Sequence, residues 1–340
     1  MLRLISGALL VLSLLLAIFG FAEKGGKLPD DFPIYKLLEA FGDKPLPHKA
    51  NLTIKGASVE RGREIVVDGM SEVAGKKSRR QSKHFTCISC HNINKEDPDL
   101  AHPAPEARLA YVSEHDMPFL QGSPLYGIVN RRSFYNGDYD KKYGDLVKPT
   151  RHNLREAIQL CAIECSQGRK LKDFEMESIL AYLWTIDLKL KDLILSDAEL
   201  KIIQHAFDTG EKKAEAMQIL HSKYLDYSPA TFVDPPADRK TGDGLTGNEE
   251  NGALIYKHSC QYCHFDNRNS FLLLDNSKMT FQHLLHKAGT YDPHSIYQVI
   301  RYGTPPKGGK EAYMPQYTKE KMTDQQMADL RAYIEAEANK

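Results

Sequence analysis

The sequence predicts a mainly helical protein built from two similar halves. A five-residue pattern of cysteines and a histidine occurs at Cys87–His91 and again at Cys260–His264. A helical pattern that begins at Asp173 returns 151 residues later, at Asp324. No stretch shows the strict alternation of apolar and polar residues that a half-buried strand requires.

Length and composition limit the possible functions. The chain has 340 residues, which corresponds to two domains at about 100–200 residues each. Its 45 Lys and Arg residues balance 45 Asp and Glu residues, so no net field attracts it to nucleic acid or to an anionic membrane surface. Apolar residues make up 41% of the chain and charged residues 26%, which is typical of a folded protein rather than a disordered one.

Residues 1–22 have the features of a targeting segment. Arg3 precedes an uncharged, mostly apolar stretch from Leu4 to Phe21, and small residues flank Phe21. This pattern predicts a secretory signal peptide cleaved after Ala22. The alternative is an uncleaved membrane anchor, because the stretch is just long enough to cross a bilayer. In both cases we expect the rest of the chain in the periplasm, after export.

The remaining residues divide into four segments. Residues 23–56 contain four prolines, and we expect them to form an irregular arm over the first domain. Residues 57–190 and 248–340 are the two repeated halves. Residues 191–247 connect them, with helical patterning from Asp197 to Leu220 followed by a linker rich in Pro, Gly, Asp and Thr.

Both five-residue patterns read C-x-x-C-H, which is the attachment motif for c-type haem. On a helical turn these positions share one face, so two thiols can bond the porphyrin vinyl groups while the histidine reaches the iron. A zinc site or disulfides are the alternative in an exported chain. A zinc ribbon pairs its C-x-x-C units closely, however, whereas 173 residues separate these motifs. We therefore predict two covalently bound haems c, held by Cys87, Cys90, His91, Cys260, Cys263 and His264.

The halves share further elements. Thr323–Gln326 forms a capping box before a closing helix, whose apolar positions match those after Asp173. The matched residues are Met176, Ile179, Tyr182 and Leu183 with Met327, Leu330, Tyr333 and Ile334. Upstream of each motif, Gly62–Ile65 parallels Gly252–Ile255. Each half thus reads as helix, haem motif, loops and closing helix, the layout of a cytochrome c domain. The Met and Tyr residues of the closing helices are expected in the core.

The sixth iron ligand of the second haem is predicted to be Met314. It lies in a Tyr-Met-Pro segment shortly before the second closing helix, and a thioether ligand there raises the reduction potential. Met279 and Met322 are weaker candidates for this ligand. Alternatively, Met314 packs in the core and does not bind the iron.

In the first half the position equivalent to Met314 is Ile163, flanked by Cys161 and Cys165. Residues four apart lie on the same face of a helix, so the side chains of Cys161 and Cys165 are expected to point in the same direction. A disulfide is one interpretation in an oxidising compartment, although parallel Cβ vectors suit a bridge poorly. The other is a cysteine thiolate on haem 1, which lowers its potential. Met117 and His102 are alternative ligands, both far from the closing helix.

The segment around these cysteines resembles the first haem domain of the dihaem thiosulfate dehydrogenases. The matching residues are Ile158, Cys161, Cys165, Gly168 and Leu171, then Glu175, Met176, Ile179, Ala181, Tyr182 and Leu183. It is more loosely similar to the haem subunit of the SoxAX sulfur-oxidation cytochrome. The resemblance covers roughly residues 58–188. It implies that Cys161 is the distal ligand of haem 1, that sulfur substrates react beside it, and that Cys165 stands where the family commonly has serine.

The sequence departs from that family at two places. Ala157 stands where the family often has arginine, with Arg155 nearby, and the second half lacks a Gly-Ala-Gly-Met segment. A sulfur oxyanion still requires cationic donors. The candidates to act with Cys161 are Arg131, Arg132, Arg155 and Arg169.

These features together predict an exported dihaem cytochrome c oxidoreductase that interconverts thiosulfate and tetrathionate. Haem 1 is expected to host the chemistry, and haem 2 to relay electrons to a soluble or membrane-bound redox partner protein. The alternative is a dihaem electron carrier without enzymatic activity. A dihaem peroxidase is less favoured, because the chain has no Pro-Tyr-Met-His segment.

Overall fold

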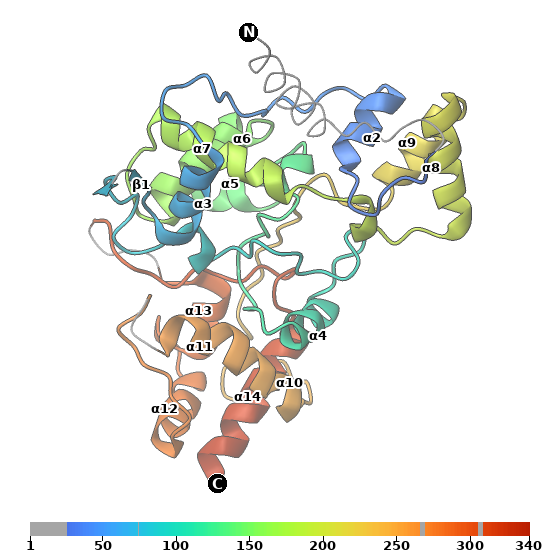
Figure 1. Ribbon diagram of the computed structural model, residues 1–340. Helices are drawn as coiled ribbons and strands as arrows, with labels where there is room; N and C mark the ends of the chain where they lie inside the picture. Colours follow the sequence, from blue (N-terminus) through green and yellow to red (C-terminus); the bar gives the residue numbers. More distant parts are fainter. Residues whose placement is uncertain (1–25, 74, 266–268, 305–308) are drawn as a thin grey trace, which may run out of the picture. The chain divides into compact units, whose positions relative to one another are not determined.

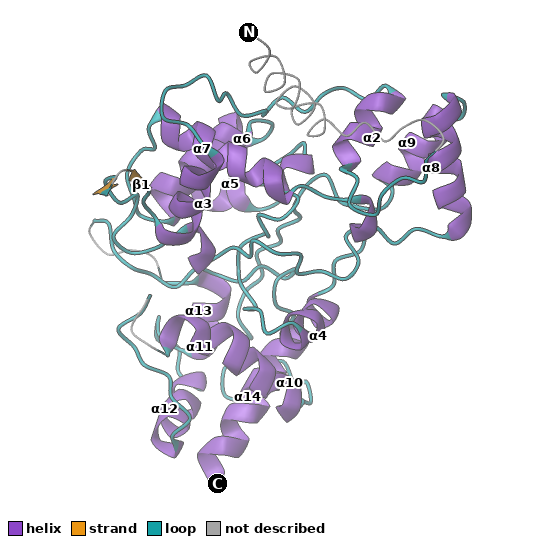
Figure 2. Ribbon diagram, viewed as in Figure 1, coloured by secondary structure: helices purple, strands orange, loops and turns teal. Residues whose placement is uncertain are grey.

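The computed structural model describes residues 26–73, 75–265, 269–304 and 309–340, so the predicted targeting segment lies outside the described residues. The described chain is mostly helical, which confirms the predicted fold class (Figures 1 and 2). Its strands are β1 (Glu72–Val73) and β2 (Lys76–Lys77), a short antiparallel pair. Gly75 between them has a φ of 74°, which glycine tolerates and which allows the tight turn.

The helices are α2 (Ile34–Phe41), α3 (Val59–Asp68), α4 (Pro105–Glu114), α5 (Tyr139–Tyr143), α6 (Leu154–Leu160), α7 (Asp173–Leu183), α8 (Asp197–Thr209), α9 (Lys213–His221), α10 (Glu249–Ile255), α11 (Gln261–His264), α12 (Lys278–Ala288), α13 (Ile296–Tyr302) and α14 (Asp324–Asn339). Two π-helical turns, Cys161–Cys165 and Tyr256–Cys260, continue α6 and α10. Short 3-10 turns lie at Cys87–Ser89, Ile128–Asn130, Gly144–Thr150, Trp184–Ile186 and Leu190–Asp192. None of the described helices combines the length and the apolar character needed to cross a bilayer.

A small helical unit contains residues 26–44 and 189–221. We expected an irregular arm at residues 23–56, but Ile34–Phe41 forms α2, which packs on α8 and α9. Pro33 precedes the helix, where its missing N–H removes no helical hydrogen bond. Ile34, Leu37 and Phe41 share the buried face of α2, so the prolines delimit this helix instead of preventing it.

A larger unit contains residues 45–188 and 222–340 and holds both repeated halves. In each half the helix before the motif packs on the closing helix, α3 on α7 and α10 on α14. A Cβ at Gly62 would lie 1.9 Å from the carbonyl oxygen of Ser178, and one at Gly252 would lie 2.1 Å from that of Asp329. Ser178 and Asp329 are the same position of the closing-helix repeat. Both halves therefore bring two helices into contact at one glycine.

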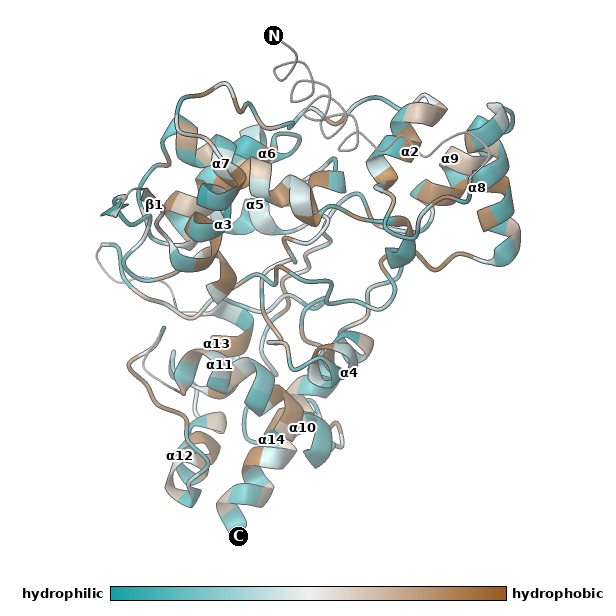
Figure 3. Cartoon of the chain, viewed as in Figure 1, coloured by the Kyte–Doolittle hydropathy of each residue, from teal (hydrophilic) through white to brown (hydrophobic). Residues whose placement is uncertain are grey.

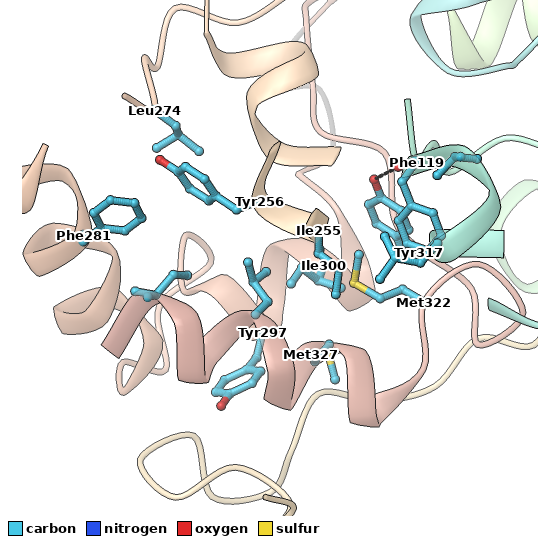
Figure 4. Packing of buried hydrophobic residues seen from close by; sticks show 14 of the residues in the cluster. Phe119, Ile255, Tyr256, Leu274, Phe281, Tyr297, Ile300, Tyr317, Met322 and Met327 are labelled. Atoms are coloured by element: carbon cyan, nitrogen blue, oxygen red, sulfur yellow. Dashed lines mark hydrogen bonds between the residues drawn. The ribbon is translucent and has the colours of Figure 1, made fainter. Parts of the chain in front are cut away.

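The core around α10 and α14 extends beyond the second half (Figure 4). Ile255, Ile300 and Met327 pack there with Leu109 and Phe119, which come from α4 and the segment after it. The dashed line in Figure 4 is the hydrogen bond that the Tyr317 hydroxyl donates to the Phe119 carbonyl at 3.0 Å. The helices are amphipathic, with brown and teal segments on the same helix (Figure 3). The apolar face of α4 thus joins the second core, which the internal repeat did not indicate.

The first half has its own core around α3, α6 and α7. Ile65, Leu154 and Ile179 are buried there. Met176 and Tyr182 lie in this core, and Met327 lies in the other. The prediction that the Met and Tyr residues of the closing helices pack in the interior is confirmed for these three, and Tyr333 is partly buried against the second core.

Candidate functional site

The first C-x-x-C-H motif forms a tight turn that places its reactive groups together. The backbone N–H groups of Cys90 and His91 both donate to the carbonyl of Cys87, at 3.2 and 3.1 Å. Nδ1 of His91 lies 2.6 Å from the Ser123 carbonyl, which can only accept, so Nδ1 carries the proton. Nε2 is left with its lone pair free for a metal.

A glycine packs against this imidazole. A Cβ at Gly122 would lie 2.5 Å from both Nδ1 of His91 and the Cys90 carbonyl oxygen. Only glycine therefore lets the Gly122–Ser123 backbone approach the ring closely enough to accept its proton. Burial lowers the pKa of His91, which keeps the imidazole in the neutral form that coordinates a metal.

The second motif repeats this arrangement. The π-helical turn and α11 carry Cys260, Cys263 and His264, and Nδ1 of His264 donates to the Leu272 carbonyl at 3.1 Å. Burial again lowers the histidine pKa, and a backbone carbonyl again orients the ring. The chain thus presents two histidines whose Nε2 atoms suit axial coordination of an iron.

The four motif cysteines fit thioether attachment better than zinc. None of the six cysteines forms a disulfide. Burial raises the pKa of Cys87 to about 11 and that of Cys260 to about 12, so without a bound group both cysteines are neutral thiols, the form that adds to a vinyl group. Within the described residues no three His, Cys, Asp or Glu side chains cluster as a metal site. The residues present therefore fit covalently attached haem.

The two motifs touch each other. The hydroxyl of Tyr262, inside the second motif, donates to the carbonyl of Ile88, inside the first, at 2.9 Å. Ser89 also donates to the side chain of Asn269 at 3.3 Å. Electrostatic repulsion from Cys263 helps burial to raise the pKa of Cys90. The two C-x-x-C-H motifs are therefore in direct contact through their side chains and backbone.

Cys161 and Cys165 lie on the π-helical turn after α6. The amide of Ser166 donates to the carbonyl of Cys161 at 2.8 Å, which closes the widened turn. The two thiols share a hydrogen bond that raises the pKa of Cys161 and lowers that of Cys165. Cys161 also interacts electrostatically with Cys87. The thiol pair therefore lies near the cysteines of the first motif.

Cys165 has two phenol partners that the sequence did not reveal. The hydroxyls of Tyr143 and Tyr135 lie 3.3 and 3.5 Å from its sulfur. They lower its pKa further, as does the ammonium group of Lys142, although burial opposes them. Tyr143 and Tyr135 lie 22 and 30 residues before Cys165 in the sequence. No motif connects residues at these separations, so the sequence alone did not indicate the contact.

Two of the predicted cationic residues are held by carboxylates of the first half. Arg155 binds Glu177 through two nitrogens, both at 2.8 Å. Arg169 binds Glu175 at 2.8 and 2.6 Å. An oxyanion would have to displace a carboxylate from either guanidinium group.

Arg131 lies elsewhere, at a small cavity of about 70 Å³ beside Ser123. It donates to the Ser228 hydroxyl at 2.7 Å and interacts with the carboxylates of Glu96 and Asp97. Arg132, next to it in the chain, accepts a hydrogen bond from His152 through its carbonyl at 3.0 Å. The guanidinium groups of Arg131, Arg155 and Arg169 thus each bind partners within the protein.

Two hydrogen bonds to Thr304 hold the backbone of Met314 in place. The Met314 N–H donates to Thr304 Oγ1 at 2.7 Å, and the Met314 carbonyl accepts from the Thr304 N–H at 2.9 Å. Its side chain is half-buried against the second core. The alternatives differ: Met322 is fully buried in that core, whereas Met279 is 77% exposed. Of the alternatives for haem 1, Met117 packs on the second core, and His102 is 84% exposed beside Asp99.

The second half of the chain matches a known protein family. Residues 247–334 match the family of subunit III of cbb3-type cytochrome c oxidase. Residues 247–334 are a cytochrome c domain. This domain indicates covalently bound haem c, electron transfer through its iron, and a redox partner.

The c-type cytochrome assignment rests on that match together with the geometry of the second motif. No curated protein and no solved structure matches the chain. The resemblance of residues 58–188 to the thiosulfate dehydrogenases therefore has no support from a relative.

Proposed function

We propose that this cytochrome carries two haems c and oxidises a sulfur compound at the first. The proposed haem domains are residues 57–190 and 248–340. Support for the first comes from its own C-x-x-C-H turn, the carbonyl-bound Nδ1 of His91, and the Gly62 helix contact that repeats the one at Gly252. Each bound haem iron would supply one-electron chemistry at a potential set by its axial ligands.

The number of haems can be counted directly. We expect the denatured protein to have the mass of the polypeptide plus two haems, because thioether bonds survive denaturation. Mass spectrometry of the intact chain measures this. A mass with one haem, or release of haem into acidified acetone, would contradict the dihaem proposal.

The proposed axial ligands are His91 and Cys161 for the first iron, and His264 and Met314 for the second. The backbone anchoring of Met314 by Thr304 favours it over the exposed Met279 and the fully buried Met322. A thiolate on one iron and a thioether on the other would separate the two potentials, with the second higher. The contact between Tyr262 and Ile88 supports transfer from the first haem to the second.

The observation that carries the enzymatic proposal is the placement of Cys161, which lies on a widened turn near the first motif. A simple electron carrier does not need a thiol there, and Cys165, hydrogen-bonded to two phenols, supports the position of Cys161. Two thiosulfate ions joined by a sulfur–sulfur bond give tetrathionate and two electrons, which matches a chain with two haems. Reduction of tetrathionate to two thiosulfate ions would use the same thiols and the same two haems.

The test is anaerobic addition of thiosulfate to the fully oxidised protein. We expect the haem absorption bands to change to those of the reduced state, with formation of tetrathionate. The matched measurement uses sulfate, which cannot be oxidised. Haems that stay oxidised with thiosulfate, and a reduced protein that stays reduced with tetrathionate, would contradict the proposed function.

The proposed location is the periplasm, with residues 1–22 as the export signal or as an anchor. Haem attachment outside the cytoplasm agrees with export. The redox partner would then be a soluble or membrane-bound protein of that compartment.

A further inference from the structure

A group of aromatic side chains surrounds the thiol pair. The rings of Tyr135 and Tyr143 lie 6.0 Å apart, and that of Tyr139 lies 5.3 and 6.2 Å from them. Tyr313, from the loop that carries Met314, interacts electrostatically with Tyr139 and with both thiols. The loop before α14 and helix α5 therefore meet at this place.

Two of these phenols have free hydroxyls. Tyr135 and Tyr143 are engaged with Cys165, whereas the hydroxyls of Tyr139 and Tyr313 form no hydrogen bond with the described residues. A phenol is neutral at neutral pH because its ordinary pKa is about 10, so both hydroxyls are O–H donors. A ligand next to the thiols would meet two unused donors.

Lys142 supplies the positive charge at this place. Its ammonium nitrogen lies 5.6 and 5.9 Å from the ring centres of Tyr143 and Tyr313, and donates to Gln316 Oε1 at 3.0 Å. No carboxylate of the described residues forms an ion pair with it. Lys141, the preceding residue, differs because it pairs with Asp138 at 2.8 Å.

The surroundings favour an anion over a cation or a neutral ligand. Lys142 lies at the surface, and no carboxylate of the described residues balances its ammonium group, so its charge is open to an anionic partner from solvent. The nearby carboxylate of Glu320 interacts with Tyr139 but is already bound by the backbone and side chain of Thr231, at 2.9 and 2.5 Å. The positive charges of Arg155 and Arg169, in contrast, are already balanced by the carboxylates of Glu177 and Glu175.

We propose that Lys142, with the hydroxyls of Tyr139 and Tyr313, binds the oxyanion end of the sulfur substrate beside the thiol pair. This proposal rests on the proposed function and assigns its substrate-binding cation. The three donors bind sulfonate oxygens, and the terminal sulfur is left to face Cys161 and Cys165. Lys142 thereby takes the role that the sequence led us to expect of the arginines.

The experiment compares Lys142→Gln with Lys141→Gln in the haem-loaded, oxidised protein. Thiosulfate and sulfite binding is measured by calorimetry, and turnover gives KM and kcat separately. We expect Lys142→Gln to weaken binding of both anions and to raise KM for thiosulfate by about tenfold or more, the usual effect of losing a charged hydrogen bond. Lys141→Gln should change either value by less than about twofold, because its exposed ion pair contributes little. Lys142→Arg should restore part of the binding.

The outcomes separate this inference from the proposed function. Equal anion binding by the wild type and Lys142→Gln overturns the role of Lys142, even if thiosulfate reduces the haems. Binding that depends on Lys142, without reduction by thiosulfate, supports the anion site and contradicts the proposed enzyme. Absence of anion binding to the wild type overturns the site altogether.

Discussion

Replacement of Cys161 by alanine should abolish thiosulfate-driven turnover and leave both haems attached. The cysteines of the two C-x-x-C-H motifs, Cys87, Cys90, Cys260 and Cys263, are unchanged by this substitution, so the proposed covalent attachment should persist. Loss of the proposed thiolate ligand would change the absorption spectrum of the first haem and raise its potential. We expect turnover to fall by about 100-fold or more, comparable with the loss of one preorganised catalytic group. Stopped-flow absorbance and a redox titration of the variant measure both effects.

Cys165→Ser is the matched control. A serine hydroxyl accepts hydrogen bonds as a thiol does, so Tyr135 and Tyr143 keep a partner there. We expect a mild effect on turnover and an unchanged spectrum of the first haem. If Cys161→Ala also keeps wild-type turnover and spectrum, Cys161 is not the ligand, and the chain functions as an electron carrier.

The elements with a local signal were predictable from the sequence. The capping box at Thr323 and the apolar spacing after Asp173 and Asp324 placed both closing helices, and α7 and α14 begin at those two aspartates. The C-x-x-C-H spacing likewise predicted a turn, which the first motif forms with the N–H groups of Cys90 and His91 on the Cys87 carbonyl. Capping, periodicity and motif spacing all act within a few residues.

The features that the sequence did not reveal depend on contacts between distant residues. Nothing in the sequence indicated that the Arg155 guanidinium group would bind Glu177, because this ion pair requires α7 to pack beside α6. Lys142 resembles any charged residue of a surface helix until the loop carrying Tyr313 and Gln316 is placed next to it. The packing of α4 in the second core likewise depends on contacts between segments that are distant in the sequence.

Substitution of alanine for either Gly62 or Gly252 should destabilise the protein. In a helix interior this change favours folding by about 1 kcal/mol from helix propensity. Each Cβ, however, would lie about 2 Å from a backbone carbonyl oxygen of the closing helix, which has no flexible end to move aside. Such overpacking costs about 1–3 kcal/mol or more, so the clash outweighs the propensity gain. We expect the free energy of unfolding to fall by about 2 kcal/mol at each site, seen as a Tm lowered by about 4–8 °C.

The two glycines also test whether the halves are equivalent. Thermal unfolding followed by haem absorbance should show a similar loss for Gly62→Ala and Gly252→Ala, because Ser178 and Asp329 occupy the same position of the repeat. The exposed Glu250→Ala on α10 is the control and should leave the Tm within about 1–2 °C, the range of a surface change within about 0.5 kcal/mol. A Gly62→Ala variant with an unchanged Tm would show that α3 and α7 separate easily. The first half would then not be built around the helix contact that defines the cytochrome c domain of the second.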